Sequence, residues 1–459
     1  MMRWTSTVAM AVLMAGCSVG PAVGPEYERP LLSMPLAWMG FEQGGGMYVD
    51  TAGAKADAEW WTVFNDTTLN SLVQQALTRN GDLRVAQARI AEARGARLAA
   101  NAALLPEIGG TAQGTRGDAN ATNRLNTTSS AVFDASWEID LFGGNRRAAQ
   151  AARARLGGTV AEAEATRLRL LADVASGYLD VRRLQQQLAF ARQNLADQRE
   201  TLKLVQAQQR EGVVSRLVVA QNEALAANTA AALPLIESNL TASVNALGIL
   251  VGAQPVEIAQ TIGGIQDVPV VTPRVLVDVP ATILERRPDV RAAERALQAA
   301  VADQGVAIAN WFPKVSLTGL FGLQDLGNGS NEAWSVGGTV SLPLIDFGRV
   351  RALVRQADAR QQQALATYEQ TVLTALADVE TSLSRYVKAV ERVQRLQEAA
   401  DASGNAARMA KLQYSEGVAS NLDVIVAEQQ KLTADDALVA GQAAVGQSLA
   451  GLYVALGGL

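Results

Sequence analysis

Four sequence landmarks occur twice in this chain of 459 residues, in the same order and about 205 residues apart. The matching stretches are residues 80–106 with 287–313, 142–148 with 346–352, 211–215 with 416–420, and 246–253 with 451–458. Ordered landmarks at a nearly constant spacing indicate an internal duplication. We therefore expect two copies of one structural unit, and any fold proposed for the chain must contain both.

Each copy contains a long segment without proline, residues 146–210 in the first and 351–414 in the second. These segments are dominated by Ala, Leu, Gln, Arg and Glu, a composition that favours long helices and coiled coils. About 65 helical residues extend on the order of 100 Å, which is too long for one globular core. We therefore expect helices packed side by side along a seam. Gly212 and Gly417 interrupt both runs at matching points, where we expect helix caps and a turn at one end of the assembly.

The order predicted within each copy is a helix, a β-hairpin, a long helix, a break and a further helix. The first helix is expected over residues 69–104, because Pro106 disfavours its continuation. Its counterpart in the second copy opens at Pro288-Asp289, with proline in the first turn and an acid at the positive helix end.

Apolar and polar residues alternate in the segments between the paired helices, over residues 133–141, 315–319 and 334–342, and more weakly in the glycine-rich residues 108–115. A period of two predicts strands with one apolar and one polar face. Strands of about ten residues with aromatic side chains on one face are typical of transmembrane barrels. The alternative is an amphipathic hairpin on a soluble domain, which is the commoner case among sheets.

Four strands cannot form a membrane structure by themselves. An open sheet in hydrocarbon exposes unpaired N–H and C=O groups at its edges, and a barrel needs about eight strands for a fillable interior. The strands must therefore be shared among copies of the chain. Three copies would supply twelve strands, although closure alone does not determine the number three.

The N-terminus has the pattern of an export signal. Arg3 precedes a short apolar run at residues 8–14, and small residues follow up to Cys17, the only cysteine. This pattern predicts a signal peptide over residues 1–16, too short to span a bilayer. It resembles the lipobox of bacterial lipoproteins, although Met14 replaces the usual leucine, so we expect a covalent lipid on Cys17. Ser18 in place of aspartate favours transfer to the outer membrane. The alternative is an ordinary signal peptide with a chance cysteine.

Composition excludes most catalytic chemistry. The chain has no histidine and one cysteine, which rules out most zinc sites, thiol–imidazole dyads and Ser–His–Asp triads. No phosphate-binding loop is present. The net charge of −5 gives no support for a nucleic-acid partner. We expect neither an enzyme nor a metal site nor any cofactor beyond the lipid.

Three motifs resemble one known family. Residues 24–30 (GPEYERP) look like its GPxYxxP motif, residues 279–290 (VPATILERRPDV) its LLxRRPDI motif, and residues 311–318 (WFPKVSLT) its FPxISLT motif. The family is that of TolC-like outer-membrane efflux factors, in its OprM/NodT branch. The resemblance implies a mainly α-helical fold with a membrane β portion. Three subunits would form a twelve-stranded barrel continuous with a tunnel of long antiparallel helices in the periplasm.

The resemblance also implies a division of the chain and a function. The division is a signal peptide (1–16), a lipid-anchored segment with part of an equatorial region (17–68), a first repeat (69–253, hairpin 107–141), an equatorial connector (254–280) and a second repeat (281–459, hairpin 313–344). Such proteins are outer-membrane exit channels for passive, gated export of small toxic compounds or drugs. Their partners are a periplasmic adaptor and an inner-membrane transporter of the resistance-nodulation-division (RND) type. The alternatives are the exit duct of a type I protein-secretion system and a structural coiled-coil envelope lipoprotein.

Members of the family close the tunnel near its helical turns. Tyr414 matches a tyrosine before the turn, Asp423 matches an acid after it, and Leu422 is an apolar candidate for the same gate. Val426 and Ala419 depart from the pattern, because a second aspartate and an arginine often occupy these positions. Three copies of Asp423 would form a ring with raised pKa and cation affinity. The alternatives are a solvated helix acid and coiled-coil packing of the tyrosine. The RRPD arginines and aspartate are expected to pair and cap helices.

Overall fold

The computed structural model describes residues 20–33, 35, 37–39, 48–50, 59–118, 125–270, 275–277, 280–325 and 329–458. The predicted signal peptide and Cys17 lie outside these residues. Contacts divide the chain into two units, which we name the strand unit (residues 1–32, 87–162 and 291–371) and the turn unit (residues 33–86, 163–290 and 372–459). Each unit contains segments from both halves of the sequence.

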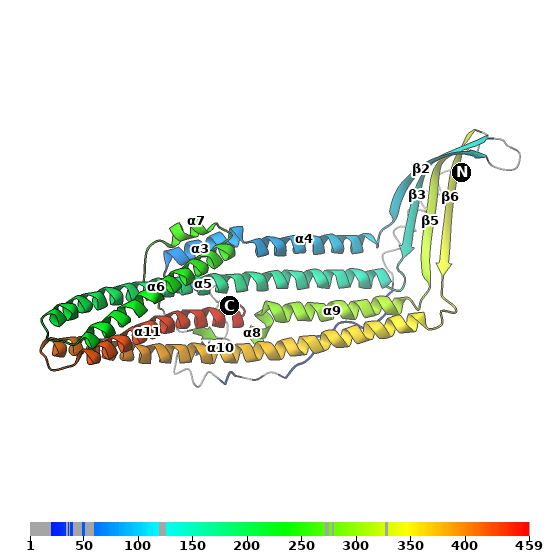
Figure 1. Cartoon of the computed structure of the whole chain (residues 1–459). Coiled ribbons are helices and arrows are strands. Elements are labelled where there is room, and N and C mark those ends of the chain that lie inside the picture. Colours follow the sequence, from blue (N-terminus) through cyan, green and yellow to red (C-terminus); the bar gives the residue numbers. More distant parts are fainter. Residues whose placement is uncertain are drawn as a thin grey trace. The chain divides into compact units, whose positions relative to one another are not determined.

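The duplication is visible in the lengths of the helices (Figure 1). Helices α4 (Gly81–Ala102) and α9 (Pro288–Ala309) both have 22 residues. Helices α5 (Gly144–Arg210) and α10 (Arg349–Ser415) both have 67 residues. The two long helices confirm the proline-free segments as continuous helices. Their composition explains this, because straight-chain residues and alanine lose little conformational freedom in a helix.

The strand unit carries one antiparallel sheet in the order β2 (Glu107–Asp118), β3 (Leu125–Ile139), β5 (Lys314–Asp325), β6 (Ser330–Ser341). Each repeat supplies one hairpin, and β3 pairs with β5 to join the hairpins. The strands extend beyond the alternating stretches seen in the sequence, since glycine-rich and polar residues continue the ladder. Strands β2 and β6 form the two edges.

The turn unit contains the largest hydrophobic core. The turn unit includes a short 3-10 helix, η2 (Trp60–Phe64), and helices α3 (Thr67–Arg79), α6 (Arg216–Val251), α7 (Pro255–Ile262), α8 (Pro280–Arg286) and α11 (Asn421–Ala455). Strand β1 (Tyr48–Asp50) pairs in parallel with β4 (Val275–Val277). In this core Trp60 stacks on Tyr453 with ring centroids 5.0 Å apart. Residues before the first repeat and between the repeats thus share one core with residues of α5, α10 and α11.

The expectation of one helix over residues 69–104 was wrong, because the chain breaks at Asn80 between α3 and α4. The Asn80 backbone is extended (φ −58°, ψ 135°). Its side-chain oxygen accepts from the Leu83 N–H at 3.0 Å, and its side-chain nitrogen donates to the Leu250 carbonyl at 2.8 Å. Asparagine is a favoured N-cap because it satisfies an orphan N–H. The second repeat breaks at the equivalent point, between α8 and α9.

Candidate functional site

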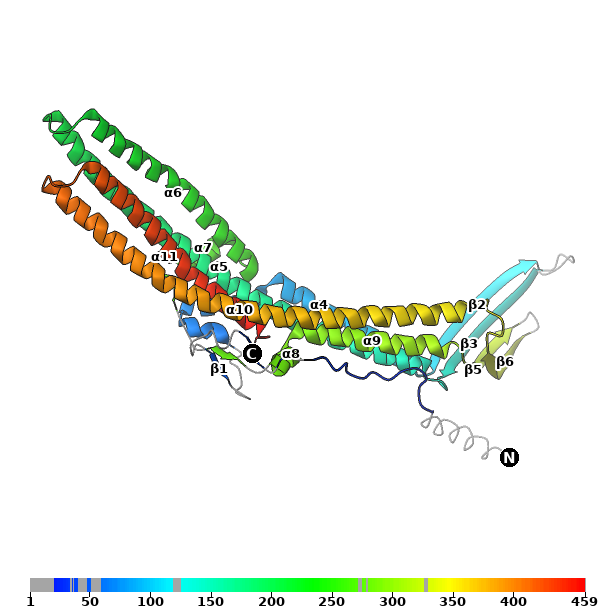
Figure 2. The same ribbon diagram turned by 90° about the horizontal axis from the view of Figure 1, so that it is seen from below.

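The two predicted turns lie at the same end of the turn unit, where α5 turns into α6 and α10 into α11 (Figure 2). Gly212 and Gly417 have φ values of +77° and +75°. The next N–H, of Val213 or Val418, donates at 2.8 Å to a carbonyl five residues earlier in the preceding helix. Glycine adopts this left-handed conformation without the steric cost of a Cβ. The identical geometry explains why glycine occurs at both points.

Tyr414 connects the second turn to the first repeat. Its hydroxyl donates to the side-chain oxygen of Gln208 on α5 at 2.9 Å, across 206 residues of sequence. Burial raises the pKa of the tyrosine, so the hydroxyl stays protonated and keeps donating. Tyr414 therefore does more than pack along a coiled coil, since it holds α10 against α5.

Asp423 is exposed and caps its own helix. Ser420 and Asp423 form a capping box, in which the Asp423 carboxylate accepts from the Ser420 N–H at 2.8 Å and from its hydroxyl at 2.7 Å. The bond from the Ser420 hydroxyl lowers the pKa of Asp423. In a single chain this residue is thus the solvated helix acid of the alternative interpretation. The adjacent Leu422 is 54% exposed.

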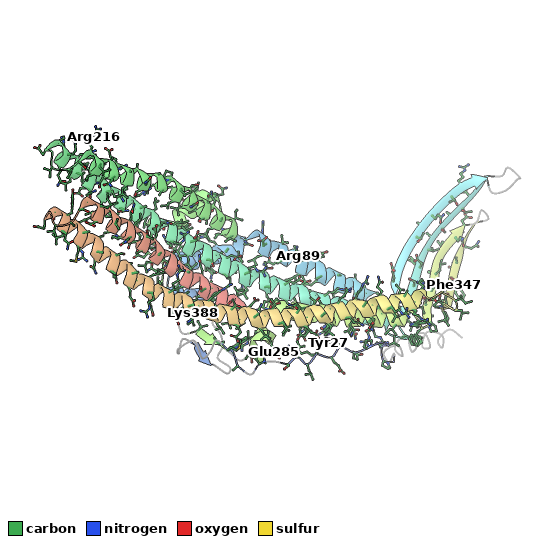
Figure 3. All side chains as sticks on the ribbon, turned by 60° about the horizontal axis from the view of Figure 1, so that its bottom comes forward. Tyr27, Arg89, Arg216, Glu285, Phe347 and Lys388 are labelled. Atoms are coloured by element: carbon green, nitrogen blue, oxygen red, sulfur yellow. The ribbon has the colours of Figure 1, made fainter. Side chains whose placement is uncertain are left out.

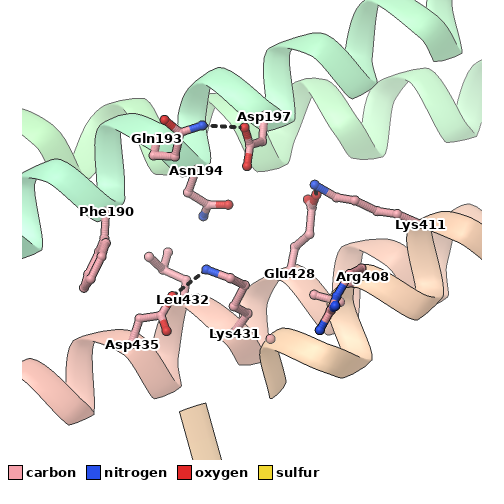
Figure 4. A pocket seen from close by; sticks show the side chains of 12 residues that line it. Phe190, Gln193, Asn194, Asp197, Arg408, Lys411, Glu428, Lys431, Leu432 and Asp435 are labelled. Atoms are coloured by element: carbon pink, nitrogen blue, oxygen red, sulfur yellow. Dashed lines mark hydrogen bonds and ion pairs between the residues drawn. The ribbon is translucent and has the colours of Figure 1, made fainter. Parts of the chain in front are cut away.

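An ion pair with a buried carboxylate near these turns was missed by sequence analysis. Glu428 on α11 is 4% exposed and lies 2.8 Å from the Lys411 amine on α10. The pair borders a cavity of about 370 Å³ between α5, α10 and α11 (Figure 4). Lys431 and Asp435 form a second ion pair in its wall, at 2.6 Å. Alternating charges normally indicate a solvated helix face, so nothing in the sequence predicted the burial of Glu428.

The cavity has no features of a metal centre. Among the residues that the structure describes, no group of three or more His, Cys, Asp or Glu side chains is arranged to hold a metal ion. Both cationic and anionic side chains line its wall, and two such pairs join as ion pairs.

The GPEYERP segment is bound in the strand unit by the start of α5. Arg147 is 2% exposed, and its guanidinium donates to the Val23 carbonyl at 3.0 Å, the Gly24 carbonyl at 3.2 Å and the Glu26 carboxylate at 2.8 Å. The preceding Arg146 donates to the Gly20 carbonyl at 2.8 Å. A buried guanidinium such as that of Arg147 needs acceptors of this kind. These bonds therefore fix the chain from Gly20 onward, which is the first described residue and comes three positions after Cys17.

Two residues of the same motif explain its spacing. Gly24 has a φ of +91°, and a Cβ there would lie 2.6 Å from the Gly305 Cα on α9. Tyr27 donates its hydroxyl to Glu294, also on α9, at 3.1 Å (Figure 3 labels Tyr27). Only glycine allows this close approach. The motif thus follows from packing against α9.

The RRPD motif forms a structural anchor in the turn unit, as expected. Arg287 is nearly buried, and its guanidinium binds both oxygens of Asp289, at 3.0 and 2.6 Å, and one oxygen of Asp378 at 3.2 Å. It also donates to the carbonyls of Ala375 and Ala455, at 3.3 and 2.9 Å. Burial opposes ionisation of Asp289, but the Arg287 hydrogen bond and charge outweigh it and lower the pKa. Planar bidentate pairing of this kind requires arginine.

Comparison with known proteins agrees with this architecture. The family model described as outer membrane efflux protein matches residues 72–253 and 279–458, the same two halves that the duplication defines. The pyoverdine export outer membrane protein OpmQ of Pseudomonas aeruginosa is 31% identical over 479 residues, covering 100% of this chain and 97% of that protein. Nodulation protein T of Rhizobium leguminosarum bv. trifolii is 30% identical over 439 residues, with 93% and 92% covered.

A solved structure shows the same fold. The outer-membrane channel OprN aligns with a TM-score of 0.86 at 33% identity, covering 95% of this chain and 99% of that one. Fold and family are those of outer-membrane channels and not of enzymes. The two matched stretches, the long paired helices and the four-stranded sheet together lead to one conclusion: this chain belongs to the outer membrane efflux protein family.

Proposed function

We propose that three copies of this chain form one channel through the outer membrane, with a twelve-stranded barrel above a tunnel of long helices. The four-stranded sheet with two edge strands is the observation that carries this proposal. Large apolar side chains on the sheet are exposed, including Phe133 at 67%, Phe321 at 62% and Trp334 at 74%. Unpaired edges are not tolerated in hydrocarbon. Closure by further copies satisfies the edges, while the exposed apolar groups face lipid.

The channel would serve as the exit of a tripartite pump, giving passive export of small toxic compounds or drugs. A periplasmic adaptor and an inner-membrane RND-type transporter would complete the pump and supply the energy. Support comes from the relative OpmQ, which is named as an outer membrane protein of pyoverdine export. The division into a signal peptide (1–16), an equatorial region (17–68 and 254–280) and two repeats (69–253 and 281–459) belongs to the same proposal.

The gate would lie where Gly212 and Gly417 turn the helices. Tyr414 would hold the closed state through its hydrogen bond to Gln208, while Leu422 and Asp423 would narrow the opening. Their exposure supports this role, because both side chains are available to equivalent residues of other copies. Bringing three Asp423 carboxylates together would counteract the pKa lowering by Ser420, since like charges disfavour ionisation.

A lipid on Cys17 would anchor the N-terminus in the same membrane. The hydrogen bonds from Arg146 and Arg147 to residues 20–26 support this, because they hold the segment that follows Cys17 in the sequence against the strand unit. A buried acyl chain contributes about 0.8 kcal/mol per methylene, so it anchors without spanning.

Planar-bilayer conductance, together with the oligomeric mass in detergent, tests the proposal. A trimer with small, long-lived conductance steps is the expected result for a membrane channel that is mostly closed. The Asp423→Asn variant should show larger conductance or weaker block by multivalent cations. A monomer without conductance would refute the shared barrel. If the variant has the conductance and the cation block of the wild type, Asp423 does not contribute to the gate.

A further inference from the structure

We infer that a cavity between the GPEYERP segment, α5 and α9 binds a phosphate ester, either as a small soluble molecule or as the headgroup of a lipid. The cavity has a volume of about 630 Å³ and lies within the strand unit. Tyr27, which lines it, is labelled in Figure 3. Every lining residue belongs to one chain, so the inference does not depend on the proposed assembly of several copies.

The cavity is lined by more cations than carboxylates. Its wall contains four arginines and one carboxylate, which are Arg147, Arg153, Arg291 and Arg295 and the side chain of Glu26. The Glu26 carboxylate lies 2.8 Å from the guanidinium of Arg147. This hydrogen bond lowers the pKa of Glu26, so the carboxylate stays ionised and paired. The pair cancels one positive charge, and three arginines remain on the wall.

Two of these arginines have no carboxylate partner within the part of the chain that the structure describes. The side chain of Arg153 on α5 makes no hydrogen bond or ion pair there, and that of Arg295 on α9 bonds only to the side-chain oxygen of Gln298, at 2.8 Å. Both arginine side chains are exposed, so their remaining N–H groups are available to a ligand. Guanidinium groups are ionised in proteins and match the spacing of phosphate oxygens.

The glutamines beside the arginines add further donors. Arg147 donates to the side-chain oxygen of Gln150 at 2.9 Å, in the same way that Arg295 donates to Gln298. Arginine has no acceptor, so each glutamine must turn its oxygen toward the guanidinium and its NH₂ group away from it. We name Gln150, Arg153, Arg295 and Gln298 the donor wall, because the polar atoms that they leave unbonded are nitrogens.

Two glycines of α5 allow Arg295 to reach this wall. A Cβ on Gly157 would lie 3.2 Å from the Arg295 Cδ, and a Cβ on Gly158 would lie 3.6 Å from the Arg295 Cβ. The stem of the arginine therefore lies directly across α5, and a larger residue at position 157 would push it away. Glycine is unfavourable inside a helix, so a pair of glycines within the 67 residues of α5 needs a packing reason, which this contact supplies.

The second repeat does not contain an equivalent wall. Helices α5 and α10 begin 205 residues apart, and Asp358 occupies the position that corresponds to Arg153. Helices α4 and α9 begin 207 residues apart, and Ala88 occupies the position that corresponds to Arg295. The donor wall is therefore a feature of this one junction and not a by-product of the duplication.

A phosphate ester fits the donor wall better than a carboxylate does. The donors come from two helices, whereas the two oxygens of a carboxylate lie in one plane and match one guanidinium. The oxygens of a phosphate are arranged tetrahedrally, so they accept from α5 and α9 at once. Pockets of about 300–1,000 Å³ hold small organic molecules, so the cavity has room for the organic part of an ester. The buried side chains of Ala154, Val301 and Ala302 provide an apolar surface for that part.

Two sources can supply such a ligand. Helix α5 begins five residues after the end of β3, and the cavity lies along the first turns of this helix. If the sheet lies in the membrane as proposed, both a phospholipid headgroup at the membrane boundary and a soluble ester in the surrounding water have access to it. The two sources share their chemistry and are distinguished by experiment.

Isothermal titration of the purified full-length protein with glycerol 3-phosphate tests the site. The protein is kept in a non-ionic detergent at about 0.15 M salt, which screens long-range attraction. We expect saturable binding, with glycerate, the carboxylate analogue, bound about five-fold more weakly. Arg153→Gln should weaken binding of glycerol 3-phosphate about ten-fold or more, because it removes a charged donor. Arg155→Gln is the matched control, since it removes the same charge two residues away from a side chain that does not line the cavity.

Lipid vesicles distinguish the two sources. Wild type and both variants are reconstituted into phosphatidylcholine vesicles that contain phosphatidylglycerol, extracted in detergent and analysed for retained lipid by native mass spectrometry. Phosphatidylglycerol that is retained by wild type and Arg155→Gln, but lost by Arg153→Gln, identifies a lipid headgroup as the ligand. Binding of glycerol 3-phosphate without retained lipid identifies a soluble ester. No saturable binding in either measurement, or equal weakening by Arg153→Gln and Arg155→Gln, would overturn the site.

A further variant tests the site without changing any charge. Gly157→Ala should displace Arg295 and weaken binding of glycerol 3-phosphate about three-fold or more, while alanine favours the helix and preserves folding. Gly95→Ala on α4, whose added Cβ would have no other atom within 4 Å, is the control. Equal affinities of the two variants would show that Arg295 does not bind the phosphate. The oligomeric mass in the same detergent keeps this result separate from the proposed channel, because a trimer without binding overturns only the phosphate site.

Discussion

Replacing Tyr414 by phenylalanine removes the hydroxyl group and keeps the aromatic ring of the side chain. The hydroxyl donates a hydrogen bond to Gln208 at 2.9 Å, which joins α10 to α5 near the two turns. If the closed channel depends on this bond, its loss must favour opening.

The size of the effect follows from the geometry. A neutral, partly buried hydrogen bond contributes about 1 kcal/mol. That corresponds to about a five-fold change in the opening equilibrium for one copy. Three copies that open together would lose about 3 kcal/mol, which is a change of about 100-fold. Tyr414→Phe should therefore raise the open probability of the proposed trimer between about five-fold and 100-fold, depending on how the copies are coupled.

Single-channel recording in planar bilayers measures this directly, and a double-mutant cycle isolates the bond. Gln208→Met removes the acceptor and keeps the volume, so it should raise the open probability by a similar factor. The double variant should then add little to either single variant. An open probability within two-fold of wild type for Tyr414→Phe, or fully additive effects of the two changes, would refute a closed state held by this contact.

Three further predictions concern stability. Arg287→Met leaves two carboxylates and two carbonyls without their shared donor and should destabilise the protein by about 3 kcal/mol. Circular dichroism should show this as a lowered thermal midpoint. An unchanged midpoint would show that water replaces the guanidinium. Gly24→Ala places a Cβ 2.6 Å from the Gly305 Cα and should expose the N-terminal segment to limited proteolysis. The control is Gly20→Ala, whose added Cβ would have no other atom within 4 Å and should leave cleavage unchanged. Equal cleavage of the two variants would contradict the packing. Burial raises the pKa of Asp436 more than the hydrogen bond from its glutamine partner lowers it, so the folded state favours the protonated form and stability falls as pH rises above about 4. Asp436→Asn should raise stability at pH 7 and flatten this dependence, and a loss of stability at pH 7 would show that the carboxylate is favourable there.

Much of the fold could be predicted because it depends on local pattern. The absence of proline and the content of helix formers determine where the two 67-residue helices run. Glycine at positions 212 and 417 marks the turns, because few other residues adopt positive φ. The break at Asn80 had a local signal as well, the Asn80-Gly81 pair, which our prediction of one helix did not use.

The candidate site was predicted less completely. Tyr414 and Asp423 were proposed from their positions next to the predicted turn, but their interactions could not be predicted. Asp423 forms a capping box with Ser420, three positions earlier, which is a pattern that can be recognised in a sequence. The partner of Tyr414 is 206 residues away, and no local rule identifies it.

The sequence by itself determined the duplication, the two long helices, the four strands and the need for other copies to close the sheet, because periodicity, breakers and unpaired edges act over short stretches of chain. Only the tertiary structure decided that Arg147, Arg287 and Glu428 are nearly buried, with exposures of 2%, 6% and 4%. The physical reason is that burying a charge is favourable only when partners surround it. Arg147 takes its partners from residues 23–26, and Arg287 takes Asp378 and two carbonyls besides its neighbour Asp289. The partner of Glu428 is Lys411, on the other side of the helix turn. These segments meet only when the chain is folded.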